Sequence, residues 1–433
     1  MLALCRGFPH NDGMICHPPT RSQGTWMAAM ASMLAVSVDV QAEGFRSPTT
    51  GAQGLGTSGG RFAFIDDASA AWHNPANLTL LPEWEVSFEP TLIHHEARYT
   101  GPFGTAKTEN PWKFLPALFV GGPLNDRVAA GLGVTVPYGL SVDWDWSQAG
   151  AMKYFAPHFV DLKTFNINPN LAFKIGDRAS LGLGLDVMWS ELQLRQDYSW
   201  ANLFQNPFLP DGELRARGDG IGVSGNVALS VDTWEGQRLA ITARLPMTVS
   251  YEGHFDASNV PLAGSSRTDF RSQIDFPTTV GVGYGVRVTD TVRVEANVEF
   301  VQFSRFESLR LGVDPVQAAT LGLPTEYAQQ WRDTFTFGVG GDWAFSEGWK
   351  LRLSYQHYQT PVPDRTFSPT IPDAAQNVVT VGLGYRLGRH RFDLAYSRVF
   401  YDDRSISSAE NEVFSGEYEI AAHLISLGYG LQF

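Results

Sequence analysis

The segment that decides the fold reads Val292-Arg293-Val294-Glu295-Ala296-Asn297-Val298-Glu299-Phe300. A β-strand turns successive side chains to opposite faces, so one face of this segment is apolar and the other carries arginine, glutamate and asparagine. The core of a two-layered soluble protein would hardly bury that second face, whereas the polar lumen of a membrane barrel can hold it. The pattern predicts a strand in the wall of a transmembrane β-barrel.

The same alternation recurs to the last residue, where Ile425, Leu427, Tyr429, Leu431 and Phe433 share one face and small or polar residues the other. We expect strands at about 84–99, 113–121, 126–138, 160–175, 179–199, 219–231, 238–255, 268–287, 290–309, 332–345, 348–359, 376–387, 390–401 and 417–433. Short and long connections alternate between them, as periplasmic turns and outer loops do. The predicted fold is all-β, a 14-stranded antiparallel transmembrane β-barrel spanning 84–433.

Composition limits the function. The chain has 433 residues, 43 of them glycine, with 12% aromatic and 18% charged residues, which suits a barrel wall but also some soluble β-rich enzymes. A formal net charge of −13 argues against nucleic acid as a partner, because phosphate binding needs a basic surface.

The amino-terminal region is predicted to be an export signal. A small and apolar run from Thr25 to Val40 follows Arg21 and ends in a cleavage pattern at Ala42, so residues 1–42 are interpreted as a signal peptide. Both cysteines, Cys5 and Cys16, precede that point, which excludes disulfides and thiolate metal sites from the mature chain.

Residues 43–83 do not fit the barrel wall. The stretch is rich in Gly, Ser and Thr, and Asp66-Asp67-Ala68-Ser69 indicates the acidic start of a short helix that stops at Asn74-Pro75. A segment of this size before the first strand, followed by strands with many lumen-facing glycines, predicts a hatch that plugs the barrel.

Several motifs have ordinary explanations. Gly54-Leu55-Gly56-Thr57-Ser58-Gly59 matches GxGxxG but lacks the strand and crossover helix of a dinucleotide site. His94-His95-Glu96 lies in an expected strand, where neighbours point oppositely, which disfavours a metal site. Asp143-Trp144-Asp145-Trp146 is interpreted as interfacial aromatics in an outer loop, with calcium binding the alternative. No GxSxG motif occurs, and we expect no cofactor, no metal and no enzymatic activity.

A set of short motifs resembles the FadL-type long-chain fatty acid transporters, a family that includes toluene-uptake members. The motifs are Asp66-Asp67-Ala68, Asn74-Pro75-Ala76, Pro123-Leu124-Asn125-Asp126, Pro137-Tyr138-Gly139-Leu140, Thr360-Pro361-Val362-Pro363-Asp364, Ile371-Pro372-Asp373 and Phe433. The resemblance covers essentially the whole mature chain. It implies passive uptake of hydrophobic compounds across the bacterial outer membrane. Long-chain fatty acids are the first expected substrates, and aromatic or aliphatic hydrocarbons are the alternative.

The resemblance also implies gating residues. In the family, ligand leaves sideways through a gap at a kinked third strand, which would place Pro137, Tyr138 and Gly139 at the gap and Asn74-Pro75-Ala76 on the hatch facing it. Independently of the family, Pro137 lacks the N–H that a sheet ladder needs and so disrupts pairing; it could also merely end its strand.

Ligand contacts follow from the same resemblance. Arg332 stands where the family has a lysine near the ligand carboxylate, and Arg195 lies one residue from a family arginine, a slip that would turn it to the other face. Phe204, Phe208 and Leu209 lie in the 200–218 loop, which is shorter than in the fatty-acid prototypes. The 310–331 loop, with Val316, Leu321 and Leu323, is expected to provide apolar surface instead.

Two rival functions remain open, a lipid hydrolase built on a barrel and an open porin for polar solutes. The plug-like segment 43–83 disfavours the porin. The expected partners are a hydrophobic small molecule, outer-membrane lipid and lipopolysaccharide, and the barrel assembly machinery, which would read the terminal Phe433; the barrel is expected to act as a monomer.

Overall fold

A computed structural model describes residues 43–433, so the predicted signal peptide at 1–42 lies outside the described residues. The segment that decided the prediction forms β15 (Val292–Val301), in which Glu295, Asn297 and Glu299 are buried while Val294 and Val298 are exposed. The charged face therefore points into the lumen and the apolar face outward, as predicted.

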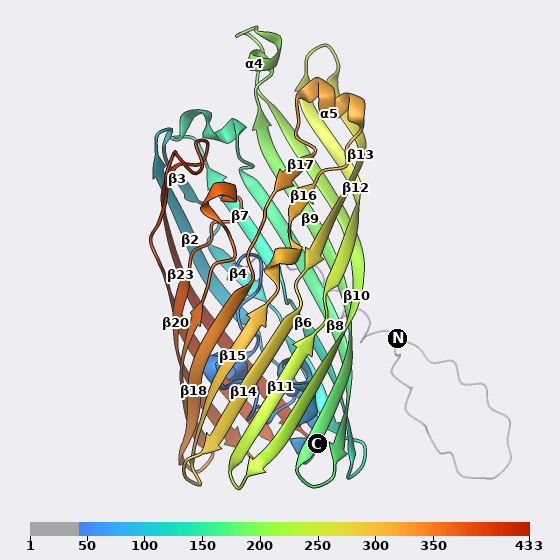
Figure 1. Cartoon of the computed structure of the whole chain (residues 1–433), viewed down its shortest axis with the longest axis vertical. Coiled ribbons are helices and arrows are strands. Elements are labelled where there is room, and N and C mark those ends of the chain that lie inside the picture. The colour runs from blue at the N-terminus through green and yellow to red at the C-terminus, as the bar shows by residue number, and fades with distance from the viewer. Residues whose placement is uncertain (1–42) are drawn as a thin grey trace, which may run out of the picture. The chain divides into compact units, whose positions relative to one another are not determined.

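The wall is a closed barrel of fourteen antiparallel strands, which confirms the predicted fold class (Figure 1). Several wall strands are divided in two. In chain order they are β1 (Glu85–Phe88) with β2 (Thr91–Gly101), β4 (Trp112–Leu115) with β5 (Leu118–Pro123), β6 (Val128–Thr135) with β7 (Gly139–Asp145), β8 (Phe159–Ile175), β9 (Ala179–Tyr198), β10 (Gly212–Trp234), β11 (Gln237–Arg244) with β12 (Met247–Val260), β13 (Gly264–Phe276) with β14 (Thr279–Arg287), β15, β18 (Thr334–Ser346), β19 (Trp349–Tyr358), β20 (Gln376–Leu387), β21 (His390–Tyr401) and β23 (Gly416–Gln432). The barrel closes where β1 and β2 pair with β23.

Each of the divided strands breaks at a proline. The breaks fall at Pro90, Pro116, Pro137, Pro246 and Pro277. Proline has no N–H to donate to the ladder, so pairing is interrupted there. The third strand resumes at Gly139 as β7, so its predicted end at residue 138 is wrong, and Pro137 divides the strand instead of terminating it.

The outer connections hold the remaining elements. They are β3 (Gly104–Thr108), η3 (Gly150–Tyr154), α4 (Trp200–Phe204), η4 (Phe303–Arg305), β16 (Ser308–Arg310), α5 (Pro315–Leu321), β17 (Glu326–Ala328), η5 (Asp364–Thr366) and β22 (Arg404–Ile406). β10 starts at Gly212, earlier than predicted, which shortens the 200–218 loop, whereas β15 ends at Val301, earlier than the predicted 309.

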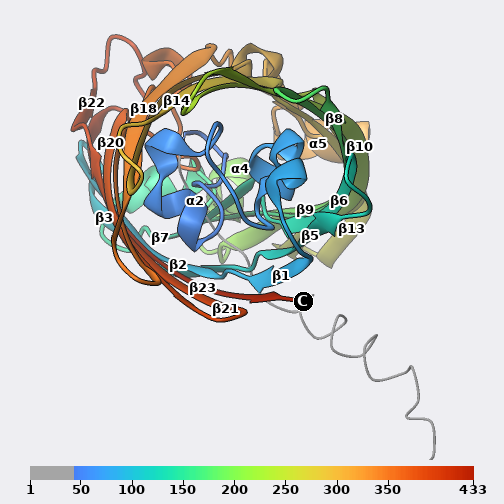
Figure 2. The ribbon, with the colours of Figure 1, turned by 90° about the horizontal axis from the view of Figure 1, so that it is seen from below.

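Residues 43–83 lie inside the ring of strands (Figure 2) and are called the plug below. They form α2 (Ala52–Gly56), η1 (Ser58–Gly60), α3 (Ala70–His73) and η2 (Pro75–Leu80). Glycine allows the plug backbone to approach the wall, because a Cβ on Gly59 would collide with the Val339 backbone and one on Gly182 with the Ala76 backbone. The plug occupies the end of the barrel where the short turns lie (Figure 1). A large cluster of buried apolar side chains lies toward the outer end.

Among residues 43–433, no helix is long and apolar enough to cross a membrane. Within the same described range, no group of three or more His, Cys, Asp or Glu side chains is placed to hold a metal ion.

Candidate ligand path through the barrel

An apolar cavity of about 510 Å³ opens among the outer connections. Its apolar lining includes Leu194 on β9, Leu214 on β10, Phe255 on β12 and Leu323 in the 310–331 loop. The volume lies within the range of about 300–1,000 Å³ that is usual for small-molecule sites. The cavity can therefore take an apolar molecule at the outer end of the barrel.

A single cluster of buried apolar side chains connects this cavity to the plug. Leu214, Phe255 and Phe367 line the cavity and belong to the same cluster as Phe45 and Tyr138. Apolar contacts therefore run without interruption from the outer cavity to the first residues of the plug.

The wall lacks ladder pairing beside Pro137. β5 pairs with β6 only as far as Leu118 opposite Val134, β4 pairs with β2, and β7 pairs with β8. No pairing joins β4 to β6 or β7 in the described residues. Pairing with the third strand returns beyond this stretch, where Glu109 N–H donates to Asp143 C=O at 2.7 Å and β3 pairs with β7 at Thr108 and Lys107. The Lys113 ammonium crosses this unpaired stretch to the Ser141 hydroxyl at 3.4 Å.

The first residues of the plug bond to the broken strand from the lumen side. Gly139 N–H donates to Phe45 C=O at 2.8 Å, and Ser47 N–H donates to Pro137 C=O at 3.0 Å. Arg46 and Tyr138 thereby form an isolated antiparallel bridge. These bonds satisfy backbone groups that the break would otherwise leave open inside the barrel.

Phe45 is 1% exposed and lies within a cage of five aromatic rings. Its ring centroid is 5.0 Å from Trp331, 5.3 Å from Phe306, 5.6 Å from Phe276, 5.9 Å from Phe303 and 6.0 Å from Tyr138. The ring of the plug's own Phe45 therefore fills an apolar site at the inner end of the cluster.

A small polar cavity of about 70 Å³ lies between the plug and the break, lined by Pro75, Pro137, Tyr138 and three arginines. Asn74 and Ala76 do not line this cavity. Asn74 instead holds the turn, because its amide donates to Phe62 C=O at 2.7 Å and to the Ser230 hydroxyl at 2.9 Å, and its Oδ1 accepts from Ala76 N–H at 3.1 Å.

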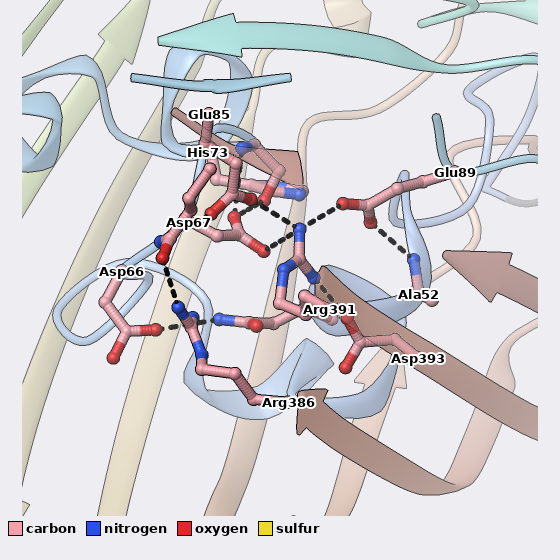
Figure 3. Close-up of polar contacts among 12 residues, drawn as sticks. Ala52, Asp66, Asp67, His73, Glu85, Glu89, Arg386, Arg391 and Asp393 are labelled. Atoms are coloured by element: carbon pink, nitrogen blue, oxygen red, sulfur yellow. Dashed lines mark hydrogen bonds and ion pairs between the residues drawn. The ribbon is translucent and has the colours of Figure 1, made fainter. Parts of the chain in front are cut away.

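Arg391 on β21 fastens the plug to the wall (Figure 3). Its guanidinium lies 2.9 Å from Asp67 of the plug, 2.8 Å from Glu85 and 2.9 Å from Glu89, and it also contacts Asp393. Burial raises the pKa of Asp67 to about 7. The attraction of Arg391 opposes this shift only in part, because this arginine is shared among several carboxylates and its contact with Asp67 is not aligned as a hydrogen bond.

A second anchor comes from β15. Glu295 accepts the backbone N–H groups of Phe62 at 2.8 Å, Ala63 at 2.9 Å and Phe64 at 3.1 Å. Glu299 accepts from Arg46 at 2.5 Å and from Arg61 at 2.7 Å. The alternating acidic register that identified the wall is thus the register that binds the plug.

The two acidic residues at 66 and 67 behave differently. Although burial opposes ionisation, Arg293 at 2.7 Å and Lys350 hold the pKa of Asp66 well below its usual range. Both carboxylates pair with wall arginines, so they do more than start the helix at Ala70 as the sequence suggested.

The structure separates the predicted ligand residues. Arg332 is exposed and lies outside the cavity lining, while its neighbour Trp331 stacks on Phe45. Arg195 stacks on Phe159 at 4.7 Å, in the register opposite to Leu194 and Gln196, which line the cavity. Phe204 and Phe208 are 52% and 92% exposed, and Leu209 packs against the apolar cluster.

Sequence reasoning missed Phe45, Trp331, Arg365 and Arg391. Arg391 could have been noticed, because it shares the lumen-facing register of a predicted strand with Asp393. Phe45 carries no such signal, since it stands alone in a Gly- and Ser-rich stretch and its cage is assembled from distant strands and loops.

A closed barrel with an internal plug, an outer apolar cavity and an apolar interior defines a transport protein of the bacterial outer membrane that carries hydrophobic compounds. The protein is a transporter and not an enzyme.

The chain belongs to the outer membrane protein transport family (OMPP1/FadL/TodX), whose model matches residues 33–433. It is 22% identical to the long-chain fatty acid transport protein of Salmonella typhi, over 84% of this chain and 89% of that one. A FadL homologue of Pseudomonas aeruginosa has the same fold, with a TM-score of 0.78, 21% identity and coverage of 90% of this chain and 100% of that one. The toluene transporter TodX of P. putida is likewise similar in fold, with a TM-score of 0.69, 15% identity and coverage of 91% and 99%.

Proposed function

We propose that the protein takes up hydrophobic compounds passively, with long-chain fatty acids as its first substrates, and releases them sideways through the break at Pro137. The observation that carries this proposal is the single apolar cluster joining the outer cavity to Phe45, which is bonded to the broken strand. Removing apolar surface from water favours entry of the ligand into this path by about 25 cal/mol per Å².

Residues 43–83 act as the hatch in this proposal, and the first of them form a latch at Phe45–Ser47. A ligand that enters the aromatic cage must replace the Phe45 ring, because the two need the same apolar space. Displacing Phe45 breaks the bonds to Pro137 and Gly139 and uncovers the unpaired stretch between β4 and β7. Pro137, Tyr138 and Gly139 thus form the exit, with Pro75 of the Asn74-Pro75-Ala76 turn at its inner edge.

The fatty-acid assignment draws on the relative from Salmonella typhi, whose name is long-chain fatty acid transport protein. The likeness to a toluene transporter supports the second candidate, uptake of aromatic or aliphatic hydrocarbons by the same path. We further propose removal of a signal peptide at 1–42, assembly through Phe433 by the barrel assembly machinery, and a monomer surrounded by lipid and lipopolysaccharide.

The latch can be tested with a disulfide. Arg46 and Tyr138 face each other across an antiparallel bridge, where Cα atoms of such a non-hydrogen-bonded pair lie about 4.5 Å apart, within disulfide range. The double variant Arg46→Cys/Tyr138→Cys, with Cys5 and Cys16 replaced by serine, should lose uptake of radiolabelled oleate when oxidised and regain it with a reductant.

The two single-cysteine variants, treated with the same oxidant, are the matched controls and should keep their uptake. Equal uptake by the oxidised and reduced double variant would show that ligand passes without release of the latch. Running toluene beside oleate tells the two substrate classes apart.

A further inference from the structure

The outer cavity has one charge. Among the described residues that line this cavity, only Arg365, in the connection between β19 and β20, carries a formal charge at neutral pH. Thr366, Ser368 and Thr370 follow on the same connection and also reach the lining, and Gln196, Gln329 and Asn411 add uncharged polar groups from other elements to a largely apolar wall.

Arg365 has no carboxylate partner in the described part of the chain. The adjacent acid, Asp364, is already taken, because its Oδ1 accepts from Arg404 Nη2 at 2.6 Å. The Arg365 side chain is exposed and keeps its donors available.

The backbone that carries Arg365 is held on both sides. On one side, Arg404 donates to Val362 C=O at 2.7 Å as well as to Asp364. On the other, Asn411 donates to Phe367 C=O at 2.9 Å, and the Phe367 ring is buried 4.6 Å from the ring of Tyr418. The cation is therefore presented at a fixed place on the cavity, with only its side chain left to adjust.

We propose that Arg365 binds the headgroup of an anionic amphiphile, a long-chain carboxylate, while the alkyl chain lies along the apolar lining. This rests on the proposed function, because it takes the outer cavity as the entry site. A carboxylate is ionised at neutral pH and matches the two-pronged donor geometry of a guanidinium. A neutral hydrocarbon would leave Arg365 without a partner and gain only the apolar contacts.

The test compares a charged and a neutral ligand with the same chain. Equilibrium binding of oleate and oleyl alcohol is measured on the full-length protein in lipid nanodiscs, for wild type, Arg365→Gln, Arg365→Lys and Arg332→Gln. We expect Arg365→Gln to weaken oleate binding by about 5- to 20-fold, which is the scale of a partly exposed charge-assisted contact. Binding of oleyl alcohol should be unchanged. Arg365→Lys should restore part of the preference.

Arg332→Gln is the matched control, because Arg332 is also exposed but does not line the cavity. A preference for oleate that survives Arg365→Gln, or one that is lost instead in Arg332→Gln, would overturn the assignment of Arg365 and leave the transport path intact. Failure of wild type to bind either ligand would instead count against the proposed function itself.

Discussion

The two halves of the lumen are built from opposite chemistry. Around the plug, wall and plug share buried ions and hydrogen bonds, such as Arg391 with Asp67 and Glu295 with three successive backbone N–H groups. Above it, the interior is packed with aromatic and aliphatic side chains that end at Phe45. The boundary between the halves falls at Arg46, whose neighbour Phe45 belongs to the apolar cage and whose own guanidinium binds Glu299.

This contrast explains how one short segment can be fixed and movable at once. Buried charges and hydrogen bonds are directional, and breaking one leaves an unpaired group at high cost, so they hold the plug in one position. Apolar contacts are not directional, so another apolar molecule of suitable size can replace the Phe45 ring itself, and the polar groups that its displacement frees are the backbone groups bonded across the break. We therefore expect the plug body to stay in place while the latch moves.

The largest effect is expected from removing the cation at the centre of the lower half. Arg391→Met leaves Asp67, Glu85, Glu89 and Asp393 buried with too little positive charge, which should cost about 5 kcal/mol, the upper part of the range for a broken buried ion pair. The plug should leave its position, and steady conductance in a planar bilayer should rise.

Arg389→Met is the control for this variant, because Arg389 lies two positions away in an exposed turn and loses the same charge. A conductance that stays at the wild-type level in correctly inserted Arg391→Met would mean that the ion cluster does not hold the plug.

A smaller and more local effect is expected in the upper half. Phe45→Ala removes the ring from its cage and should destabilise the latch by about 3 kcal/mol, the low end for a buried phenylalanine, because the short latch can relax around the vacated site. Hydrogen exchange at Ser47 and Gly139, whose N–H groups bond across the break, should accelerate by up to about 100-fold.

The peptide that covers residues 60–67 provides the comparison within the same sample, because its N–H groups bond to Glu295 in the lower half. Its exchange should not change, and Phe45→Leu should recover part of the protection at Ser47. Faster exchange in both peptides together would refute the division of the lumen into two independent halves.

Sequence predicted the wall well and the site poorly, for a physical reason. The alternation in β15 or β23 is local, since a lumen side and a lipid side impose it on each strand separately, and strands β20 and β21 have the predicted bounds. The cage around Phe45 depends on rings from several strands and loops, and the pairing of Arg391 with Asp67 joins residues more than 300 positions apart. Pro137 lies between these cases, because its missing N–H predicts a break, but not that the plug bonds to it.

The smallest effect separates two adjacent carboxylates within the lower half, and its sign differs between them. Burial raises the pKa of Asp67 to about 7, above an unfolded value near 4, so the folded plug keeps a proton that the unfolded chain releases. The stability contributed by Asp67 is therefore complete below about pH 4 and is lost as the pH rises to about 7. Asp66 behaves oppositely, because Arg293 lowers its pKa, so its contribution is present at neutral pH and is lost in acid.

At pH 8, Asp67→Asn should stabilise the plug by about 1–2 kcal/mol. Asp66→Asn should instead destabilise the plug by under about 1 kcal/mol, since the Asp66 side chain is still 36% exposed. Hydrogen exchange of the 60–75 peptide between pH 5 and pH 8, corrected for intrinsic rates, measures both, and changes of the same sign in the two variants would show that Arg391 and Arg293 hold the plug in the same way.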